Sequence, residues 1–164
     1  MEDKSKLTVR VYDKIAKKYT ELFFGDSSDD EFVEKFLKML PKGAKILDVG
    51  CGPGGDVKFF LEMGYFAQGI DMSKEMIKIA KQKVPDGIFS IMDMRRLGYI
   101  NESFDGIFAV YSLIHIPTRE GVSTPKEFNR VLKKGGFLLL STPNFLHWVN
   151  RLTILAGKIP FEEG

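Results

Sequence analysis

Apolar residues recur at two spacings along the 164-residue chain, and the change from one spacing to the other predicts alternating helices and strands. Spacings of three or four positions across residues 7–24 predict an amphipathic helix. Its buried face is expected to carry Val11, Ile15, Tyr19 and Leu22. A second helix is expected to run from Asp29 or Asp30, either of which can cap it, to about Leu40.

Short apolar runs bounded by glycine, proline and acidic residues predict five strands further along. They are expected over residues 45–49, 65–70, 88–92, 104–110 and 137–141. Helical segments separate these runs, including one capped by Ser73 and one that opens with the capping box Thr124-Pro125-Lys126-Glu127 and ends at Gly135. This alternation indicates an α/β fold, a doubly wound Rossmann-like three-layer sandwich built on a mostly parallel sheet.

After Pro143 no further alternating run is found, and residues 145–155 are expected to form a last helix. The fifth strand would then lie at the edge of the sheet, where its unpaired backbone groups could pair with a second copy of the chain in a homodimer. A single domain is predicted over residues 1–164, made of a helical cap (1–42), a core (43–143) and a C-terminal helix and tail (144–164).

The segment Lys45–Gly55 passes from an apolar strand into a glycine-rich loop and then into a helix. Glycines allow sharp turns and a close approach of a ligand, and the free N–H groups at the helix start face that ligand. Gly50-x-Gly52-x-x-Gly55 satisfies the dinucleotide-binding fingerprint, with Asp71 lying 71 − 50 = 21 residues after the first glycine. Asp48 argues against a dinucleotide, because a carboxylate at the strand end would repel a pyrophosphate and favour a cationic ligand.

Charge and composition narrow the classes of partner. A formal net charge of +2 does not indicate nucleic acid, and the adjacent Arg95 and Arg96 are interpreted as solvated surface. No run of ~18 apolar residues predicts a membrane span, and residues 1–6 lack the apolar core of a signal peptide. The one cysteine, Cys51, excludes an internal disulfide and is interpreted as a small loop residue rather than a nucleophile. We expect a cytoplasmic protein with no metal.

Three motifs carry a resemblance to a known family. The run Ile46-Leu47-Asp48-Val49-Gly50-Cys51-Gly52-Pro53-Gly54 closely resembles the first motif of class I S-adenosylmethionine-dependent methyltransferases. Tyr111-Ser112-Leu113-Ile114-His115-Ile116-Pro117 is similar to the fourth motif in its small-molecule (type 11-like) form. Leu132-Lys133-Lys134-Gly135-Gly136 is similar to the family's approach to its fifth strand. The resemblance covers residues 8–143 and implies the strand order 3-2-1-4-5, with the family's C-terminal antiparallel hairpin expected to be missing here.

The resemblance implies S-adenosylmethionine as the cofactor and S-adenosylhomocysteine as the product. Asp71, at a strand end, can accept both ribose hydroxyls. By resemblance, Asp93 would accept from the adenine amino group, and the segment that contains Tyr12 and Tyr19 would form a lid. The predicted cofactor-binding residues are Tyr12, Tyr19, Asp48, Gly50, Cys51, Gly52, Pro53, Gly54, Asp71, Met72, Met76, Asp93, Met94, Val110 and Tyr111. His115 is the candidate general base, with a structural role as an equal alternative.

The leading hypothesis is therefore an enzyme that transfers a methyl group from S-adenosylmethionine to a small-molecule acceptor by in-line displacement. Two alternatives stay open: a nicotinamide-dependent Rossmann oxidoreductase, and a non-catalytic module that binds S-adenosylmethionine. Because the family's hairpin often helps to shape the acceptor pocket, cofactor binding is expected to be retained even if methyl transfer is weak without it.

Overall fold

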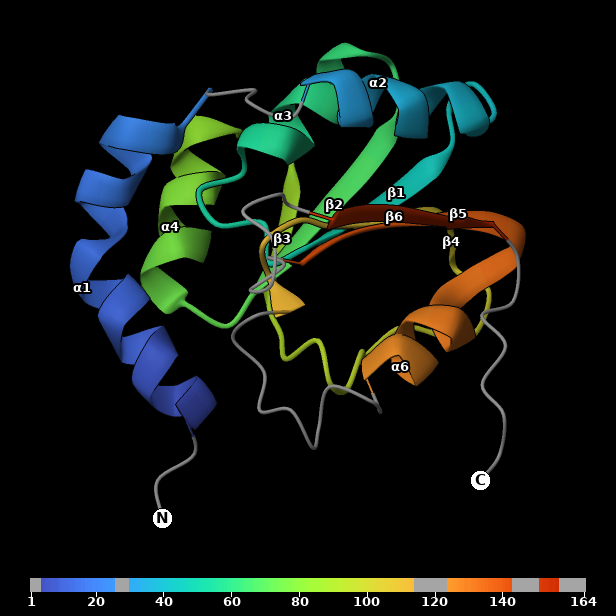
Figure 1. The fold of residues 1–164 in the computed structure, drawn as a ribbon. Helices are drawn as coiled ribbons and strands as arrows, with labels where there is room; N and C mark the ends of the chain where they lie inside the picture. The colour runs from blue at the N-terminus through green and yellow to red at the C-terminus, as the bar shows by residue number, and fades with distance from the viewer. Residues whose placement is uncertain (1–3, 26–29, 114–123, 143–150, 157–164) are drawn as a thin grey trace.

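A computed structural model describes residues 4–25, 30–113, 124–142 and 151–156. Its centre is a sheet of strand order β3-β2-β1-β4-β5-β6 (Figure 1). The strands are β1 Lys45–Val49, β2 Phe66–Asp71, β3 Ile88–Ile91, β4 Phe104–Ala109, β5 Leu132–Thr142 and β6 Arg151–Ala156. The first five pair in parallel, so the predicted order 3-2-1-4-5 is confirmed.

The sixth strand corrects the prediction for the C-terminal segment. A helix was expected over residues 145–155, but β6 pairs antiparallel with β5 from Phe137↔Ala156 to Thr142↔Arg151. In the described part of the chain, β5 is therefore not an edge strand, and the reason for expecting a homodimer through that edge no longer holds. The spacing of apolar residues in this segment also fits a strand, and the exposed backbone of β5 supplies the hydrogen-bond partners that make it one.

Helices cover both faces of the sheet, which confirms the three-layer sandwich (Figure 1). The helices are α1 Lys4–Phe23, α2 Asp30–Met39, α3 Gly55–Glu62, α4 Lys74–Lys83 and α6 Thr124–Val131. One core joins residues of α2, α3 and α4 to the sheet, centred on Phe36, Phe60 and Phe108. The other packs Phe128 and Val131 of α6 against the opposite face. Helix α6 ends at Val131 and not at Gly135 as expected, because β5 begins at the next residue.

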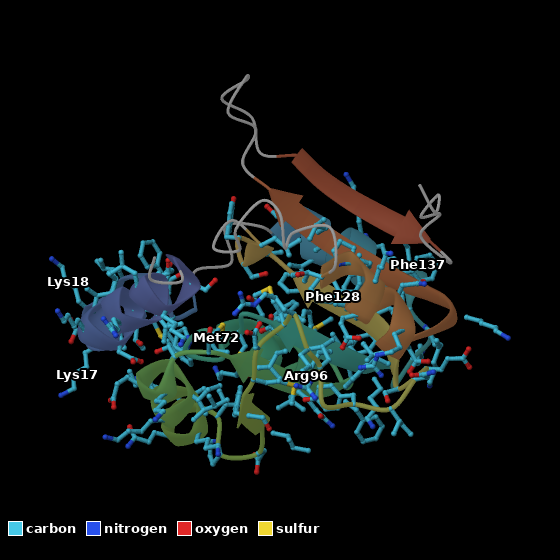
Figure 2. All side chains as sticks on the ribbon, turned by 90° about the horizontal axis from the view of Figure 1, so that it is seen from below. Lys17, Lys18, Met72, Arg96, Phe128 and Phe137 are labelled. Carbon is cyan, nitrogen blue, oxygen red and sulfur yellow. The ribbon has the colours of Figure 1, made fainter. Side chains whose placement is uncertain are left out.

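Helix α1 stands at the side of the sheet and packs along α4 (Figure 1). Its expected buried face is wrong in part: Val11, Ile15 and Leu22 are 47%, 41% and 61% exposed. The small or polar residues Ala16 and Thr20 are buried instead. The Thr20 hydroxyl donates to the Ala16 carbonyl at 2.7 Å, which satisfies this polar group inside the helix itself. Lys17 and Lys18 project from α1 away from the rest of the molecule (Figure 2).

The topology places the site. Strand β1 pairs with β2 on one side and with β4 on the other, so the chain reverses direction across the sheet between these two neighbours. In open parallel sheets, ligands bind at the carboxyl ends of the strands beside such a switch point. Within the described residues, no helix combines the length and the apolar character needed to cross a membrane.

Candidate functional site

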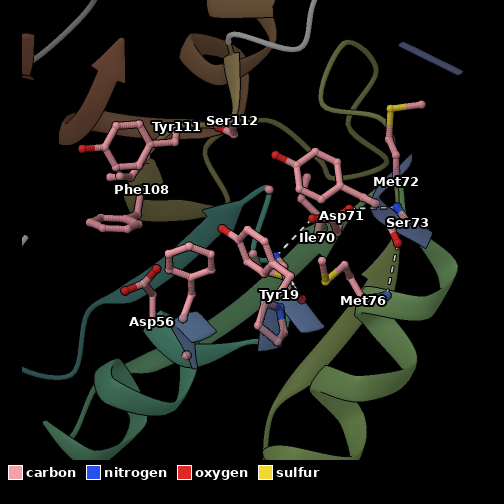
Figure 3. Close-up of a pocket in the computed structure, with 18 of the residues that line it drawn as sticks. Tyr19, Asp56, Ile70, Asp71, Met72, Ser73, Met76, Phe108, Tyr111 and Ser112 are labelled. Atoms are coloured by element: carbon pink, nitrogen blue, oxygen red, sulfur yellow. Dashed lines mark hydrogen bonds between the residues drawn. The ribbon is translucent and has the colours of Figure 1, made fainter. Parts of the chain in front are cut away.

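A cavity of about 650 Å³ opens at the carboxyl ends of the central strands. Its walls come from α1, from the glycine loop after β1, from α3, and from the ends of β2, β3 and β4 (Figure 3). Asp71, Met72, Ser73 and Met76 lie on one side of the view and Phe108 and Tyr111 on the other, with Tyr19 between them. The volume falls within the range of roughly 300–1,000 Å³ typical of ligand sites.

The glycine loop is held in a conformation that side chains resist. Gly50, Gly52 and Gly54 have φ values of 79°, 50° and 87°, all in the left-handed region. At Gly50 a Cβ atom would also lie 2.5 Å from the Cβ atom of Ser112. The Gly50 and Cys51 N–H groups both donate to the Ile70 carbonyl, at 2.8 and 3.0 Å, so the loop is fastened to the end of β2.

Asp71 joins the loop to the start of α4. Its Oδ2 accepts from the Gly52 N–H at 3.0 Å, and its Oδ1 accepts from the Ser73 N–H at 2.8 Å. Burial raises the pKa of this carboxyl above its ordinary value, although these backbone hydrogen bonds lower it in part. Each carboxylate oxygen can accept a second hydrogen bond, so Asp71 can still receive ligand hydroxyls.

Asp48 is buried behind the glycine loop, 2% exposed. Its Oδ2 has no hydrogen-bond partner among the described residues. Burial raises the pKa of the Asp48 carboxyl well above its ordinary value, and the carboxylates of Asp56 and Asp71 raise it further. A cation bound beside the loop would offset both effects.

Helix α1 closes one side of the cavity with stacked aromatic rings. The rings of Tyr12 and Tyr19 lie edge to face with centroids 5.8 Å apart, and Tyr19 is 4.7 Å from Phe23. Burial raises the pKa of both tyrosines, so they stay neutral at physiological pH. Asp13 docks the helix: its Oδ1 accepts from the Ser73 hydroxyl at 2.6 Å and from the Glu75 N–H at 3.3 Å.

The loop after β3 contradicts one interpretation. Arg95 was expected to be solvated, but its side chain is only 20% exposed and its guanidinium pairs with Asp93, with Nη2 and Oδ2 2.6 Å apart. Nε of Arg95 donates to both Asp93 oxygens. Both residues line the cavity, so Asp93 stands there as half of an ion pair and not as an isolated carboxylate.

Aromatic side chains from α1, α3 and β4 also line the cavity. Phe108 lies near the end of β4, and Tyr111 and Ser112 follow that strand (Figure 3). Tyr111 has a φ of 52°, which is rare for a residue with a ring and typical of strained functional sites. We name the lining residues Phe23, Phe59, Phe108, Tyr111 and Ser112 the aromatic end. Asp71, Met72, Ser73 and Met76, together with Gly50–Pro53, form the cofactor end.

Most of the predicted cofactor-binding residues line this one cavity: Tyr12, Tyr19, Gly50, Cys51, Gly52, Pro53, Asp71, Met72, Met76, Asp93, Met94, Val110 and Tyr111. Two do not. Asp48 lies behind the loop, and a Cβ atom on Gly54 would meet Phe89 at 2.9 Å, so Gly54 serves packing. His115 lies outside the described residues.

Sequence reasoning missed several lining residues. Phe23 of α1 and Phe59 of α3 look like ordinary apolar helix positions, and nothing in their local spacing indicates that they line the cavity. Asp13 sits beside a predicted lid tyrosine, which was the available signal for its role. The Cys51 thiol is buried and its pKa is raised well above the ordinary value, which agrees with a packing role. No group of residues suited to hold a metal ion is found in the described ranges.

Comparisons with known proteins agree on one family. A family model described as a methyltransferase domain matches residues 46–136. The demethylmenaquinone methyltransferase of Thermotoga maritima is 30% identical over 172 residues, covering 97% of this chain and 73% of that protein. The tRNA (carboxymethyluridine(34)-5-O)-methyltransferase of Arabidopsis thaliana is 34% identical over 142 residues, covering 85% of this chain and 33% of that protein.

The fold is found among solved structures as well. A crystal structure of an S-adenosylmethionine-dependent methyltransferase from Methanosarcina mazei superposes with a TM-score of 0.62 at 27% identity, covering 67% of this chain and 56% of that chain. The chain spans between 35% and 56% of the length of four other curated relatives that it matches.

Proposed function

This chain belongs to the class I S-adenosylmethionine-dependent methyltransferases, and from that membership we propose that it transfers a methyl group from S-adenosylmethionine to a small-molecule acceptor by in-line displacement. The acceptors named for its relatives include demethylmenaquinone and a tRNA. Family membership alone therefore does not identify the acceptor. The proposal depends on the charges and side chains that line the cavity.

The observation that carries the proposal is the concentration of negative charge around the glycine loop. Asp48, Asp56 and Asp71 surround it, and the last two raise the pKa of the first. A nicotinamide dinucleotide would bring two phosphates into this field and be repelled. S-adenosylmethionine carries a sulfonium and an ammonium group and no phosphate, so the same field favours it.

The residues present fit this cofactor. The unpartnered Oδ2 of Asp48 offers a buried acceptor behind the loop, and a bound cation would favour its ionised form. A Cβ atom at Gly50 would displace Ser112 and narrow the cavity there, which explains the need for glycine. Asp71 is already fixed by two backbone N–H groups and can accept ribose hydroxyls with its remaining lone pairs. The adenine contacts of Asp93 and Met94 remain a prediction.

When bound, S-adenosylmethionine supplies a methyl group on a good leaving group, so the transfer needs no covalent catalyst. The protein's task is to align the acceptor and to keep water out. Helix α1 covers the cavity with Tyr12 and Tyr19 and is held in place through Asp13 and Ser73. These contacts support a lid that limits water at the reacting atoms. His115 remains the candidate general base.

Calorimetric titration of the purified chain tests the proposal. We expect S-adenosylhomocysteine to bind and NADH not to bind. The reverse result would favour an oxidoreductase. Binding of S-adenosylhomocysteine with no methyl transfer to any acceptor in a broad panel would instead leave a non-catalytic binding module.

A further inference from the structure

We propose that the aromatic end of the cavity takes an uncharged acceptor that carries a flat aromatic ring and a ring hydroxyl, and that Ser112 hydrogen-bonds this hydroxyl. The inference rests on the proposed function and names the substrate class of the same site. Three independent features support it: the walls of the aromatic end, one buried hydroxyl there, and the ion pairs of the cations that line the cavity.

The walls are rings contributed by separate elements. Phe23 comes from the end of α1, Phe59 from α3, and Phe108 and Tyr111 from the end of β4 and the residues after it. Phe108 is 1% exposed and fixed in the core, whereas Phe23 is 50% exposed and free to adjust against a ligand. Aromatic side chains stabilise a flat ring by offset or edge-to-face contacts as well as by apolar burial.

Ser112 provides the one polar feature of this end that lacks a partner. The residue is 5% exposed and lines the cavity, and its buried Oγ makes no hydrogen bond within the described part of the chain. A buried hydroxyl without a partner is destabilising, and a site that offers one discriminates strongly for a ligand that supplies the partner. Because Ser112 packs on Gly50, this hydroxyl lies where the aromatic end meets the glycine loop.

The charged groups argue against a phosphorylated acceptor such as RNA. Among the described residues, two cationic side chains line the cavity, and each faces a carboxylate: Arg95 forms a largely buried pair with Asp93 at 2.6 Å, and Lys58 forms an exposed pair with Glu62 at 3.2 Å. Asp56 adds a further negative charge to the lining of the cavity (Figure 3). An anionic acceptor would have to displace one of these ion pairs and then meet carboxylates, whereas a neutral ring meets neither obstacle.

Three naphthalene probes test the role of Ser112 and the charge of the acceptor separately. Each probe is titrated into protein saturated with S-adenosylhomocysteine. They are 1-naphthol, 1-methylnaphthalene, which can neither donate nor accept a hydrogen bond, and 1-naphthyl phosphate, which is anionic. We expect 1-naphthol to bind most tightly and 1-naphthyl phosphate not to bind. The variant Ser112→Ala should weaken 1-naphthol binding about 3- to 10-fold and leave 1-methylnaphthalene binding unchanged.

Ser141→Ala is the matched control. Ser141 is fully buried, its Oγ also lacks a partner among the described residues, and it does not line the cavity. This variant should bind 1-naphthol as the wild type does. Equal losses in both variants, or no loss in Ser112→Ala, would overturn the role of Ser112. Binding of 1-naphthyl phosphate as tight as that of 1-naphthol would overturn the acceptor class. Failure of S-adenosylhomocysteine to bind would instead refute the proposed function itself.

Discussion

The two ends of the cavity are built in different ways. The cofactor end consists of short contiguous segments at strand ends, and its backbone groups are tied together: Asp71 alone accepts from Gly52 and Ser73. The aromatic end takes single side chains from α1, α3 and β4, and it contains a strained Tyr111 and a Ser112 hydroxyl without a described partner. The cofactor end is rigid, and its polar groups already hydrogen-bond one another. The aromatic end is adaptable, and the Ser112 hydroxyl is left to hydrogen-bond a ligand.

This difference suggests a division of roles. A cofactor shared by a whole family needs a fixed site, which backbone geometry provides. An acceptor that varies among relatives is better served by side chains, because they can be exchanged without changing the fold. Substitutions should therefore damage stability and cofactor binding at the first end and leave both nearly unchanged at the second, except at the core residue Phe108.

Gly50→Ala should have the largest effect. The new Cβ atom would lie 2.5 Å from the Ser112 Cβ atom at a φ of 79°, so strain and overpacking add. We expect the free energy of unfolding to fall by about 2–5 kcal/mol in urea denaturation. The control is Gly64→Ala, with a φ of 84° and no atom within 4 Å, which should lose only about 1 kcal/mol. Equal losses would show that the loop is no more constrained than an ordinary helix end.

Asp71→Asn should have the second-largest effect, and this effect should be a loss of ligand affinity. The amide can accept from only one of the two N–H groups that the carboxylate now binds, and it loses the charge that strengthens ribose contacts. S-adenosylhomocysteine affinity should fall by about 1.5–3 kcal/mol in calorimetry. Asp105→Asn is the control, since Asp105 accepts from the Lys45 N–H at the other end of β1. Unchanged affinity in Asp71→Asn would refute the ribose assignment.

Asp48→Asn should stabilise the ligand-free protein and weaken its binding of S-adenosylmethionine. Burial raises the pKa of the Asp48 carboxyl, so its ionisation opposes folding: stability is highest with the carboxyl protonated and is lost as pH rises through the folded-state pKa. Removing the charge should add about 1–2 kcal/mol to the free energy of unfolding above that pH, with little change below it.

The titration of the Asp48 carboxyl should also appear in the pH dependence of S-adenosylmethionine binding. A cationic ligand favours the ionised carboxylate, so the wild-type affinity for S-adenosylmethionine should rise with pH through this pKa, and that of Asp48→Asn should not. Parallel pH profiles of the two proteins would place the important charge elsewhere.

Tyr111→Asn should have the smallest effect on the cofactor. Asparagine tolerates the left-handed conformation that Tyr111 adopts at a φ of 52°, so stability should change by less than about 1 kcal/mol. S-adenosylhomocysteine affinity should stay within about 0.5 kcal/mol of the wild type. A larger loss of S-adenosylhomocysteine affinity in calorimetry would show that Tyr111 belongs to the cofactor end, and the two ends of the cavity would then be less distinct.

The parts of the molecule that the sequence predicts are those decided by local chemistry. The Ser73 cap accepts from the Met76 N–H at 3.2 Å as expected, and the glycine loop follows β1 directly. The strand order came from family resemblance and topology rules, and the structure confirms it. The same local logic places Asp71 at a strand end, next to the loop that it anchors.

The predictions that failed concern features that depend on partners remote in sequence. Val11 and Ile15 have helical apolar spacing, but α1 turns the smaller Ala16 and Thr20 inward because α4, and not the sheet, is its neighbour. Strand β6 exists through pairing with β5, which periodicity in its own segment cannot reveal. Ser112 can be assigned to the site only from the structure, which places it against Gly50.

The reversal of the chain at β1 has a consequence for how the protein folds. Leu47 pairs with Gln68, a separation of 68 − 47 = 21 residues, and with Ile107, a separation of 107 − 47 = 60 residues. Closing the longer loop costs more entropy, so the junction of β1 with β4 should form later than the β1–β2 pair. Gly50 and Ser112 meet across that junction, so the cavity is completed only when the two halves of the sheet join. A ligand that contacts both halves would then stabilise the chain against partial opening, linking cofactor supply to the lifetime of the folded state.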